Sequence, residues 1–257
     1  MLYQSIQYIK FLLKSTNQHG VHSPFVYNLV TKCFYDKTKH KAYYSISSYR
    51  KTLLKNSSKI RVTDLGAGSH VMKNQERRVS KMARNAGSTC KRAKLLYRIT
   101  SYFKPKNILE LGTSLGISTY AMSLENPNAK ITSIEGCPNI SAFTKKQLEK
   151  LQVKNVSIIN GDFNDVIAKH VSKQYDLIFF DGNHQKEATL SYFETLLQTA
   201  NNDSVFIFDD IYWSKNMTEA WETIKKHPKV TVTVDTFFWG FVFFRKEQVK
   251  EHFTIRV

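Results

Sequence analysis

From Lys106 onward, short apolar runs alternate with segments in which apolar residues recur at helical spacing. This alternation is typical of βαβ units and predicts an α/β fold with a parallel sheet. The expected strands are Asn107–Leu111, Lys130–Glu135, Val156–Asn160, Tyr175–Phe180 and Ser204–Asp209. The expected helices are Ser114–Leu124, Pro138–Leu151, Asp162–His170, Lys186–Thr199 and Lys215–His227.

The tail "KVTVTVDTFFWGFVFFRKE" contains two further strand patterns in direct succession around Thr236, with no helical pattern between them. Consecutive strands joined by a short turn form a hairpin, and the strands of a hairpin are antiparallel. The last strand is therefore expected to run antiparallel to its neighbour.

The first hundred residues carry mainly helical patterns. Ser23 followed by Pro24 is a typical helix start, and weaker patterns cover Leu2–Leu13 and Tyr43–Leu54. A further helix, with Ser88 as its expected cap, should end before Pro105. The chain is thus expected to consist of a helical extension over residues 1–105 and an α/β domain over residues 106–257.

Positive charge is concentrated in the same N-terminal part. Residues 1–106 hold 22 Lys and Arg against 3 acidic residues, whereas residues 107–257 hold 16 against 18. Such a segment is attracted to nucleic acid, a membrane surface or an acidic protein, unless its charges only form a solvated surface.

The segment "VSKMARNAGSTCKRAKLLYRI" suggests one specific use of this charge. Ala83, Gly87 and Leu96 stand where helix-turn-helix modules place a small residue, a turn glycine and a core aliphatic. The alternative is that Leu95–Phe103 is a helix that packs beside the first strand of the α/β domain.

The sequence shows no clear pattern of a membrane span, a signal peptide or a cysteine-based site. No window approaches the ~18 consecutive apolar residues of a membrane-spanning helix. The N-terminus does not have the pattern of a signal peptide, so we expect a cytoplasmic protein. Cys33, Cys90 and Cys137 are far apart and predict neither disulfides nor a zinc site.

Two glycine-containing stretches compete as a nucleotide-cofactor loop: "DLGAGS" at residues 64–69 and "ELGTSLG" at residues 110–116. The second follows a clear apolar strand and precedes a helical pattern, which is the context that such a loop requires. Glu135 also ends the next strand about 20 residues on, where a carboxylate accepts hydrogen bonds from a ribose. The first stretch lacks both features and is expected to be a turn.

Five motifs occur in an order that resembles the class I S-adenosylmethionine-dependent methyltransferases: "NILELGTSLGIST", "ITSIEG", "INGDFNDVI", "YDLIFFDGNH" and "VFIFDDIYW". Within that group the chain resembles the catechol and caffeoyl-CoA O-methyltransferases and their bacterial relatives. The resemblance covers residues 106–245. It implies a Rossmann-like, doubly wound sheet of seven strands with an antiparallel last strand, after an N-terminal helical extension.

The resemblance also implies a set of residues that bind S-adenosyl-L-methionine. Two of them have ordinary structural alternatives, because Ser118 could simply start a helix and Asp162 could cap one. The implied cofactor-binding residues are Glu110, Gly112, Ser118, Glu135, Asp162 and Asp181.

Asp181, Asp209 and Asp210 follow apolar strands, at the strand ends where ligands bind in open α/β sheets. Three such oxygen ligands suit Mg²⁺ or a similar divalent cation. The catechol-type enzymes use two Asp and one Asn, so Asp210 departs from the family pattern and could instead be a capping residue.

His184 stands where the catechol-type enzymes place a catalytic lysine. A histidine at that position could remove the proton of the acceptor at neutral pH, or it could only make structural hydrogen bonds. His184 and Asp181 are the expected catalytic residues.

The expected function is methyl transfer from S-adenosylmethionine to a hydroxyl of a small molecule, assisted by a divalent metal. Two alternatives stay open, namely methylation of nucleic acid guided by the basic N-terminal half and a non-catalytic cofactor-binding protein. A homodimer is the assembly that we consider.

Overall fold

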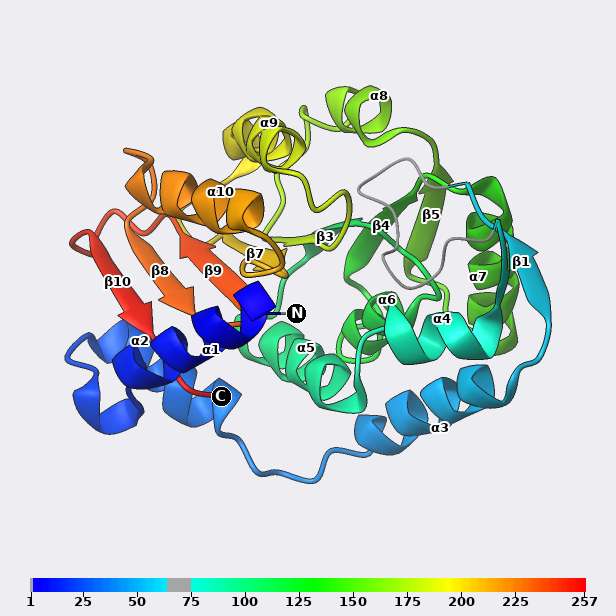
Figure 1. Cartoon of the computed structure of the whole chain (residues 1–257), viewed down its shortest axis with the longest axis horizontal. Coiled ribbons are helices and arrows are strands. Elements are labelled where there is room, and N and C mark those ends of the chain that lie inside the picture. The colour runs from blue at the N-terminus through cyan, green and yellow to red at the C-terminus, as the bar shows by residue number, and fades with distance from the viewer. Residues whose placement is uncertain (1, 64–74) are drawn as a thin grey trace. The chain divides into compact units, whose positions relative to one another are not determined.

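Eight strands form the Rossmann-like sheet, and they belong to two units of the chain (Figure 1). The structure is a computed structural model that describes residues 2–63 and 75–257. One unit combines Met1–Tyr35 with Ile167–Val257, and the other comprises Asp36–Val166. Both units draw on the first hundred residues, and the expected boundary between residues 105 and 106 stays a prediction. The sheet has one strand more than expected.

The 36–166 unit contains three parallel strands in the order β3-β4-β5. They are β3 (Asn107–Leu111), β4 (Lys130–Glu135) and β5 (Val156–Asn160), which confirms the predicted strands residue for residue. The apolar positions of β3 from Ile108 to Leu111 are all buried, so the strand has helices on both sides, as parallel strands require.

The helices of this unit follow the predicted pattern with small shifts at their ends. α5 packs against α3 and α6, and α7 packs against β4 and β5. The helices are α3 (Ala42–Lys55), α4 (Val79–Asn85), α5 (Cys90–Phe103), α6 (Ile117–Ser123), α7 (Pro138–Lys150) and α8 (Phe163–Ala168), the last of which runs into the other unit.

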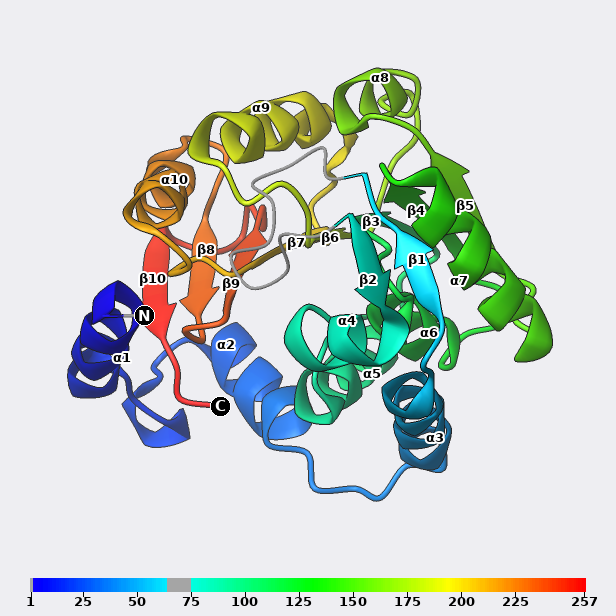
Figure 2. The ribbon, with the colours of Figure 1, turned by 45° about the vertical axis from the view of Figure 1, so that its right-hand side comes forward.

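A short antiparallel hairpin joins α3 to α4. Its strands are β1 (Lys59–Arg61) and β2 (Glu76–Arg78), and β1 lies against α7 (Figure 2). The glycine stretch at residues 64–69 falls between them and lies outside the described residues.

α5 does not have the surface of a DNA recognition helix. Its cap is Thr89, whose hydroxyl accepts a hydrogen bond from the N–H of Arg92 at 3.2 Å, and not Ser88 as expected. A recognition helix needs an exposed face that reaches base edges. From residue 90 to 100, Lys91 is the one residue of this described helix that is fully exposed. α5 therefore packs against α3 and α6 of its unit, and its predicted packing beside the first strand stays a prediction.

The other unit contains five strands in the order β10-β8-β9-β7-β6. β9 runs antiparallel to β7 and β8, which confirms the predicted hairpin, and β10 runs parallel to β8. β10 was not predicted, because four residues of mixed polarity give little strand signal. The strands are β6 (Leu177–Phe180), β7 (Val205–Asp209), β8 (Val232–Asp235), β9 (Trp239–Phe243) and β10 (Glu251–Thr254).

α9 and α10 lie side by side in this unit (Figures 1 and 2). None of the helices in the described part of the chain is long and apolar enough to cross a membrane. The helices are α1 (Leu2–Lys14), η1 (Gln18–Gly20), α2 (Pro24–Leu29), η2 (Val30–Phe34), α9 (Lys186–Leu196), η3 (Leu197–Thr199) and α10 (Lys215–Lys226).

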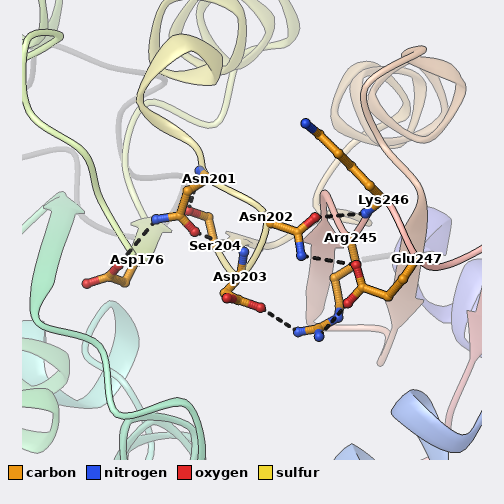
Figure 3. Close-up of polar contacts among 8 residues, drawn as sticks. All are labelled: Asp176, Asn201, Asn202, Asp203, Ser204, Arg245, Lys246 and Glu247. Carbon is orange, nitrogen blue, oxygen red and sulfur yellow. Dashed lines mark hydrogen bonds and ion pairs between the residues drawn. The ribbon is translucent and has the colours of Figure 1, made fainter.

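A polar network fixes the register of β7 against β9 (Figure 3). Asn202, just before β7, accepts a hydrogen bond from the N–H of Lys246 at 2.9 Å and donates to Glu247 at 3.0 Å. Arg245 pairs with Asp203 at 2.9 Å and with Glu247 at 2.5 Å. Single exposed ion pairs contribute little, but a connected set restrains its members together.

Gly240, in the middle of β9, makes room for the buried indole ring of Trp221. A Cβ atom at this position would lie 2.6 to 2.8 Å from three atoms of that ring. Trp221 is 1% exposed, so the ring has no open space into which it could move.

We expect Gly240→Ala to lower the free energy of unfolding by roughly 1–3 kcal/mol, the usual cost of overpacking a core. The midpoint of urea unfolding measures this loss. The same change in a Trp221→Leu background should cost much less, because the smaller side chain leaves room for the methyl group. Equal losses in both backgrounds would show that contact with Trp221 is not the cause.

Candidate functional site

The turn between β3 and α6 uses backbone conformations that few residues adopt. Gly112 has a φ of 101° and Gly116 a φ of 71°, both in the left-handed region that glycine enters without strain. A Cβ atom on Gly116 would also lie 2.5 Å from Thr144 Cγ2. The N–H of Gly112 donates to the carbonyl of Ile134 at 2.9 Å. The turn is therefore held against the end of β4.

Glu135 ends β4, and its carboxylate fixes two turns. Oε2 accepts a hydrogen bond from the N–H of Ser114 at 2.8 Å, and Oε1 accepts one from the N–H of Cys137 at 2.9 Å. The side chain is 9% exposed. A carboxylate offers about four acceptor positions. These two bonds are thus compatible with the ribose-binding role that the sequence predicts for Glu135.

Glu110 lies fully buried in β3, beneath the same turn. Its Oε2 accepts hydrogen bonds from the hydroxyls of Thr119 at 2.5 Å and Ser133 at 2.6 Å. Its Oε1 has no partner among the residues that the structure describes. Burial raises the pKa of Glu110 to about 7, although the two hydroxyl bonds oppose the shift. A buried acceptor without a partner fits an N–H group of a bound ligand.

Ser118 lies in the first turn of α6 and is 5% exposed. Its Oγ is 2.6 Å from Oγ of Ser88, so two hydroxyls meet at this position. The role of Ser118 in binding the carboxylate of a cofactor stays a prediction. Ser88 was not predicted to lie at this site, because Ser118 is 30 residues away from it in the sequence.

Asp162 caps the short helix α8. Its Oδ1 accepts hydrogen bonds from the N–H of Asn164 at 2.9 Å and from the Asn164 amide at 3.0 Å. Asp162 therefore does cap a helix, which is the structural alternative given for it above. A contact of Asp162 with the adenine of a cofactor stays a prediction.

In the other unit, the loop after β6 carries Asp181 and His184. The distance from Nε2 of His184 to Oδ1 of Asp181 is 3.9 Å, and the two side chains are 23% and 21% exposed. This distance is too long for a hydrogen bond. The catalytic roles of His184 and Asp181 stay a prediction.

The three aspartates expected to bind a metal do not form a cluster. Asp209 is 6% exposed, and its Oδ1 accepts a hydrogen bond from the N–H of Asp210 at 2.8 Å. Across residues 2–63 and 75–257, no three His, Cys, Asp or Glu side chains gather as ligands for a metal ion. The arrangement of Asp181, Asp209 and Asp210 thus does not fit the expected three-carboxylate site, and metal binding stays a prediction.

Asp235, at the end of β8, is a buried carboxylate whose role the sequence analysis missed. It accepts hydrogen bonds from the hydroxyl of Tyr212 at 2.5 Å and from the N–H of Phe237 at 2.8 Å. Burial raises the pKa of Asp235 above its ordinary value, although these hydrogen bonds oppose the shift. The rings of Tyr212 and Phe237 also stack at 5.2 Å. The signal was available, because Asp235 ends an apolar strand as Asp209 does.

Comparisons with known proteins agree with this geometry. A family model described as a methyltransferase domain matches residues 109–211. The chain is 28% identical to a catechol O-methyltransferase of Niastella koreensis over 46% of this chain and 55% of that protein. It is also 28% identical to a release factor glutamine methyltransferase of Escherichia coli, over 25% of this chain and 24% of that protein. The chain thus spans about half of the first relative and a quarter of the second.

Solved structures show the same fold. The methyltransferase PaMTH1 of Podospora anserina, with S-adenosylhomocysteine bound, has a TM-score of 0.61 at 15% identity, covering 88% of this chain and 97% of that one. An O-methyltransferase of Bacillus cereus in complex with S-adenosylhomocysteine has a TM-score of 0.52 at 17% identity, covering 82% and 93%. These structures confirm the predicted fold, and the match of a methyltransferase domain to residues 109–211 is consistent with the predicted family.

The buried Glu110 predicts a pH dependence of stability. Its pKa in the folded protein, about 7, lies above the ordinary value of 4.5, so the folded state holds the proton more tightly than the unfolded state. Stability from this group is complete below about pH 4.5 and is lost as the pH rises towards 7. We expect the loss to be on the order of 2–3 kcal/mol, measured by urea unfolding of the ligand-free protein.

Glu110→Gln should flatten this decline, because the amide does not ionise. The exposed Glu149 on α7 provides the control, and Glu149→Gln should keep the decline of the wild type. An unchanged pH profile in Glu110→Gln would assign the decline to other groups.

Proposed function

We propose that the chain is a class I S-adenosylmethionine-dependent methyltransferase, and that it transfers a methyl group from S-adenosylmethionine to a hydroxyl of a small molecule. The observation that carries the proposal is the Glu135 carboxylate, which joins the turn after β3 to the turn after β4. These bonds hold the Glu135 carboxylate beside the glycine turn, which supports the ribose-binding role because a cofactor loop of this fold has a carboxylate at that position.

The 36–166 unit supplies the residues that would bind the cofactor. When bound, S-adenosylmethionine supplies an electrophilic methyl group on a sulfonium. Glu135 would accept hydrogen bonds from the ribose, and the orphaned Oε1 of Glu110 would accept one from the methionine part. Gly112, Ser118 and Asp162 keep the roles that the sequence predicts. The structures of PaMTH1 and of the Bacillus cereus enzyme contain S-adenosylhomocysteine, the product of such a transfer.

His184 and Asp181 are the residues that would handle the acceptor proton. His184 would take the proton as the acceptor oxygen forms its bond to the methyl carbon and the carbon–sulfur bond breaks. Asp181, 3.9 Å away, would stabilise the resulting imidazolium. The proton would then leave His184 to solvent.

A hydroxyl acceptor is favoured by the catechol O-methyltransferase among the relatives. The match to the glutamine methyltransferase spans 65 residues, a quarter of this chain, and does not select an acceptor. The proposed reaction includes no step that depends on a divalent cation, because Asp181, Asp209 and Asp210 do not gather as ligands.

Calorimetry with S-adenosylmethionine tests the cofactor assignment. Glu135→Gln should weaken binding by about 10- to 100-fold, which corresponds to the loss of charge-assisted hydrogen bonds. A 2′-deoxyribose analogue of the cofactor should bind less tightly than the natural cofactor to the wild type, but equally to the variant. Tight binding of both ligands by Glu135→Gln would remove Glu135 from the site.

Turnover of phenolic acceptors, followed by release of S-adenosylhomocysteine, tests the catalytic assignment. His184→Gln should lower kcat by roughly 10²- to 10⁴-fold, the usual contribution of a general base, with unchanged cofactor affinity. His170→Gln is the control and should keep full activity. Equal activity of the two variants would contradict the role of His184, and activity that a chelator abolishes and Mg²⁺ restores would place a cation in the site.

The same assay separates the alternatives. Methyl transfer to RNA or DNA, with steep salt dependence of nucleic-acid binding, would identify a nucleic-acid methyltransferase. Cofactor binding without turnover of any acceptor would identify a non-catalytic protein.

A further inference from the structure

The helix α1 (Leu2–Lys14) buries Phe11 on one face and exposes a row of apolar side chains on the opposite face. The outer face holds Leu2, Ile6, Ile9 and Leu13, which we call the outer stripe. Their exposed fractions are 77%, 44%, 59% and 83%. At 100° per residue these four positions fall within an arc of about 60°, so the side chains form one continuous row.

The opposite face of α1 holds the helix in place. Phe11 is 5% exposed, and its ring lies 5.5 Å from that of Phe237. The hydroxyl of Tyr3 donates to Thr218 at 2.9 Å. The outer stripe is therefore not the face by which α1 packs on its own unit, because Phe11 on the opposite face makes that contact.

The end of the helix is tied down as well. The guanidinium of Arg256 donates to the carbonyl of Leu12 at 3.1 Å and to the hydroxyl of Ser15 at 3.2 Å. α1 thus presents the outer stripe to solvent in a fixed orientation. Single exposed Leu or Ile side chains are ordinary, but a fixed row of four indicates an interaction surface.

The charged residues of α1 itself are both positive. Lys10 and Lys14 are exposed on the same helix. At 100° per residue, Lys10 lies about 40° from Ile6 around the helix axis, and Lys14 lies about 40° further on the same side. The sequence contains no Asp or Glu from residue 1 to 35. An apolar row bordered by lysines matches the pattern of helices that lie in the interface of an anionic membrane.

A second copy of the chain fits this surface less well. It would bring the same positive charges, and the whole chain has a net charge of +17. Four side chains of this size expose roughly 500 Å², short of the roughly 800 Å² per partner that stable protein interfaces bury.

We propose that the outer stripe of α1, together with Lys10 and Lys14, docks the protein reversibly on an anionic lipid surface. The apolar row enters the boundary between headgroups and acyl chains, while the two ammonium groups stay at the level of the lipid phosphates. This proposal is independent of the catalytic function proposed above.

Co-sedimentation of the full chain with vesicles tests the proposal. We expect binding to phosphatidylcholine vesicles that contain about 30% phosphatidylserine, and weak binding to pure phosphatidylcholine. Ile9→Gln/Leu13→Gln should lower the partition coefficient on the anionic vesicles by at least about tenfold. Val249→Gln removes an equally exposed apolar side chain elsewhere and should bind like the wild type.

A pair of charge variants separates local contact from general attraction by the basic chain. Lys10→Gln/Lys14→Gln should weaken vesicle binding clearly more than Lys51→Gln/Lys55→Gln, which removes the same charge from exposed positions of α3. Equal effects of the two pairs would overturn the proposal, as would a wild type that ignores anionic vesicles or an Ile9→Gln/Leu13→Gln variant that binds fully. In analytical ultracentrifugation, a wild-type dimer that this variant converts to monomer would instead assign the stripe to a second copy.

Discussion

A carboxyl group buried without full hydrogen bonding is the constraint on which the cofactor half of this protein depends. Glu110 lies in β3, and its Oε2 atom accepts hydrogen bonds from hydroxyl groups of α6 and β4. The Ser133 hydroxyl also meets that of Thr113 at 2.6 Å, so the network extends into the glycine turn. Because a buried carboxyl group is costly wherever its partners are missing, these elements must keep their mutual positions.

The loops that follow the strands share a second feature. Ser114, Asn183, Asp210 and Phe237 all have φ angles between 48° and 72°, although none of them is glycine. They lie after β3, β6, β7 and β8 respectively, in the loops that carry the candidate residues. Left-handed backbone at non-glycine positions costs energy and tends to gather at functional sites. Carboxylates at the strand ends help to hold these turns, as Asp235 does for Phe237.

Much of the fold could be predicted from sequence, because the signals are local. Strands β3, β4 and β5 have the predicted bounds, since each is a short apolar run between polar residues. β10 escaped prediction because its pairing with β8 creates the strand, not the four residues themselves. The cap of α5 shifted from Ser88 to Thr89 for a similar reason, because Ser88 is engaged by Ser118.

The sequence by itself determined which glycine stretch forms the turn after β3, the bounds of β3, β4 and β5, and the α/β fold class. Each of these follows from residue types at fixed spacing along the chain. Only the tertiary structure decided that Glu110 keeps an unpartnered oxygen, that three expected metal ligands stay apart, and that one apolar face of α1 remains uncovered. Those outcomes depend on contacts between residues far apart in the chain. The spacing of apolar residues along α1 does not show which face of the helix the rest of the protein will cover.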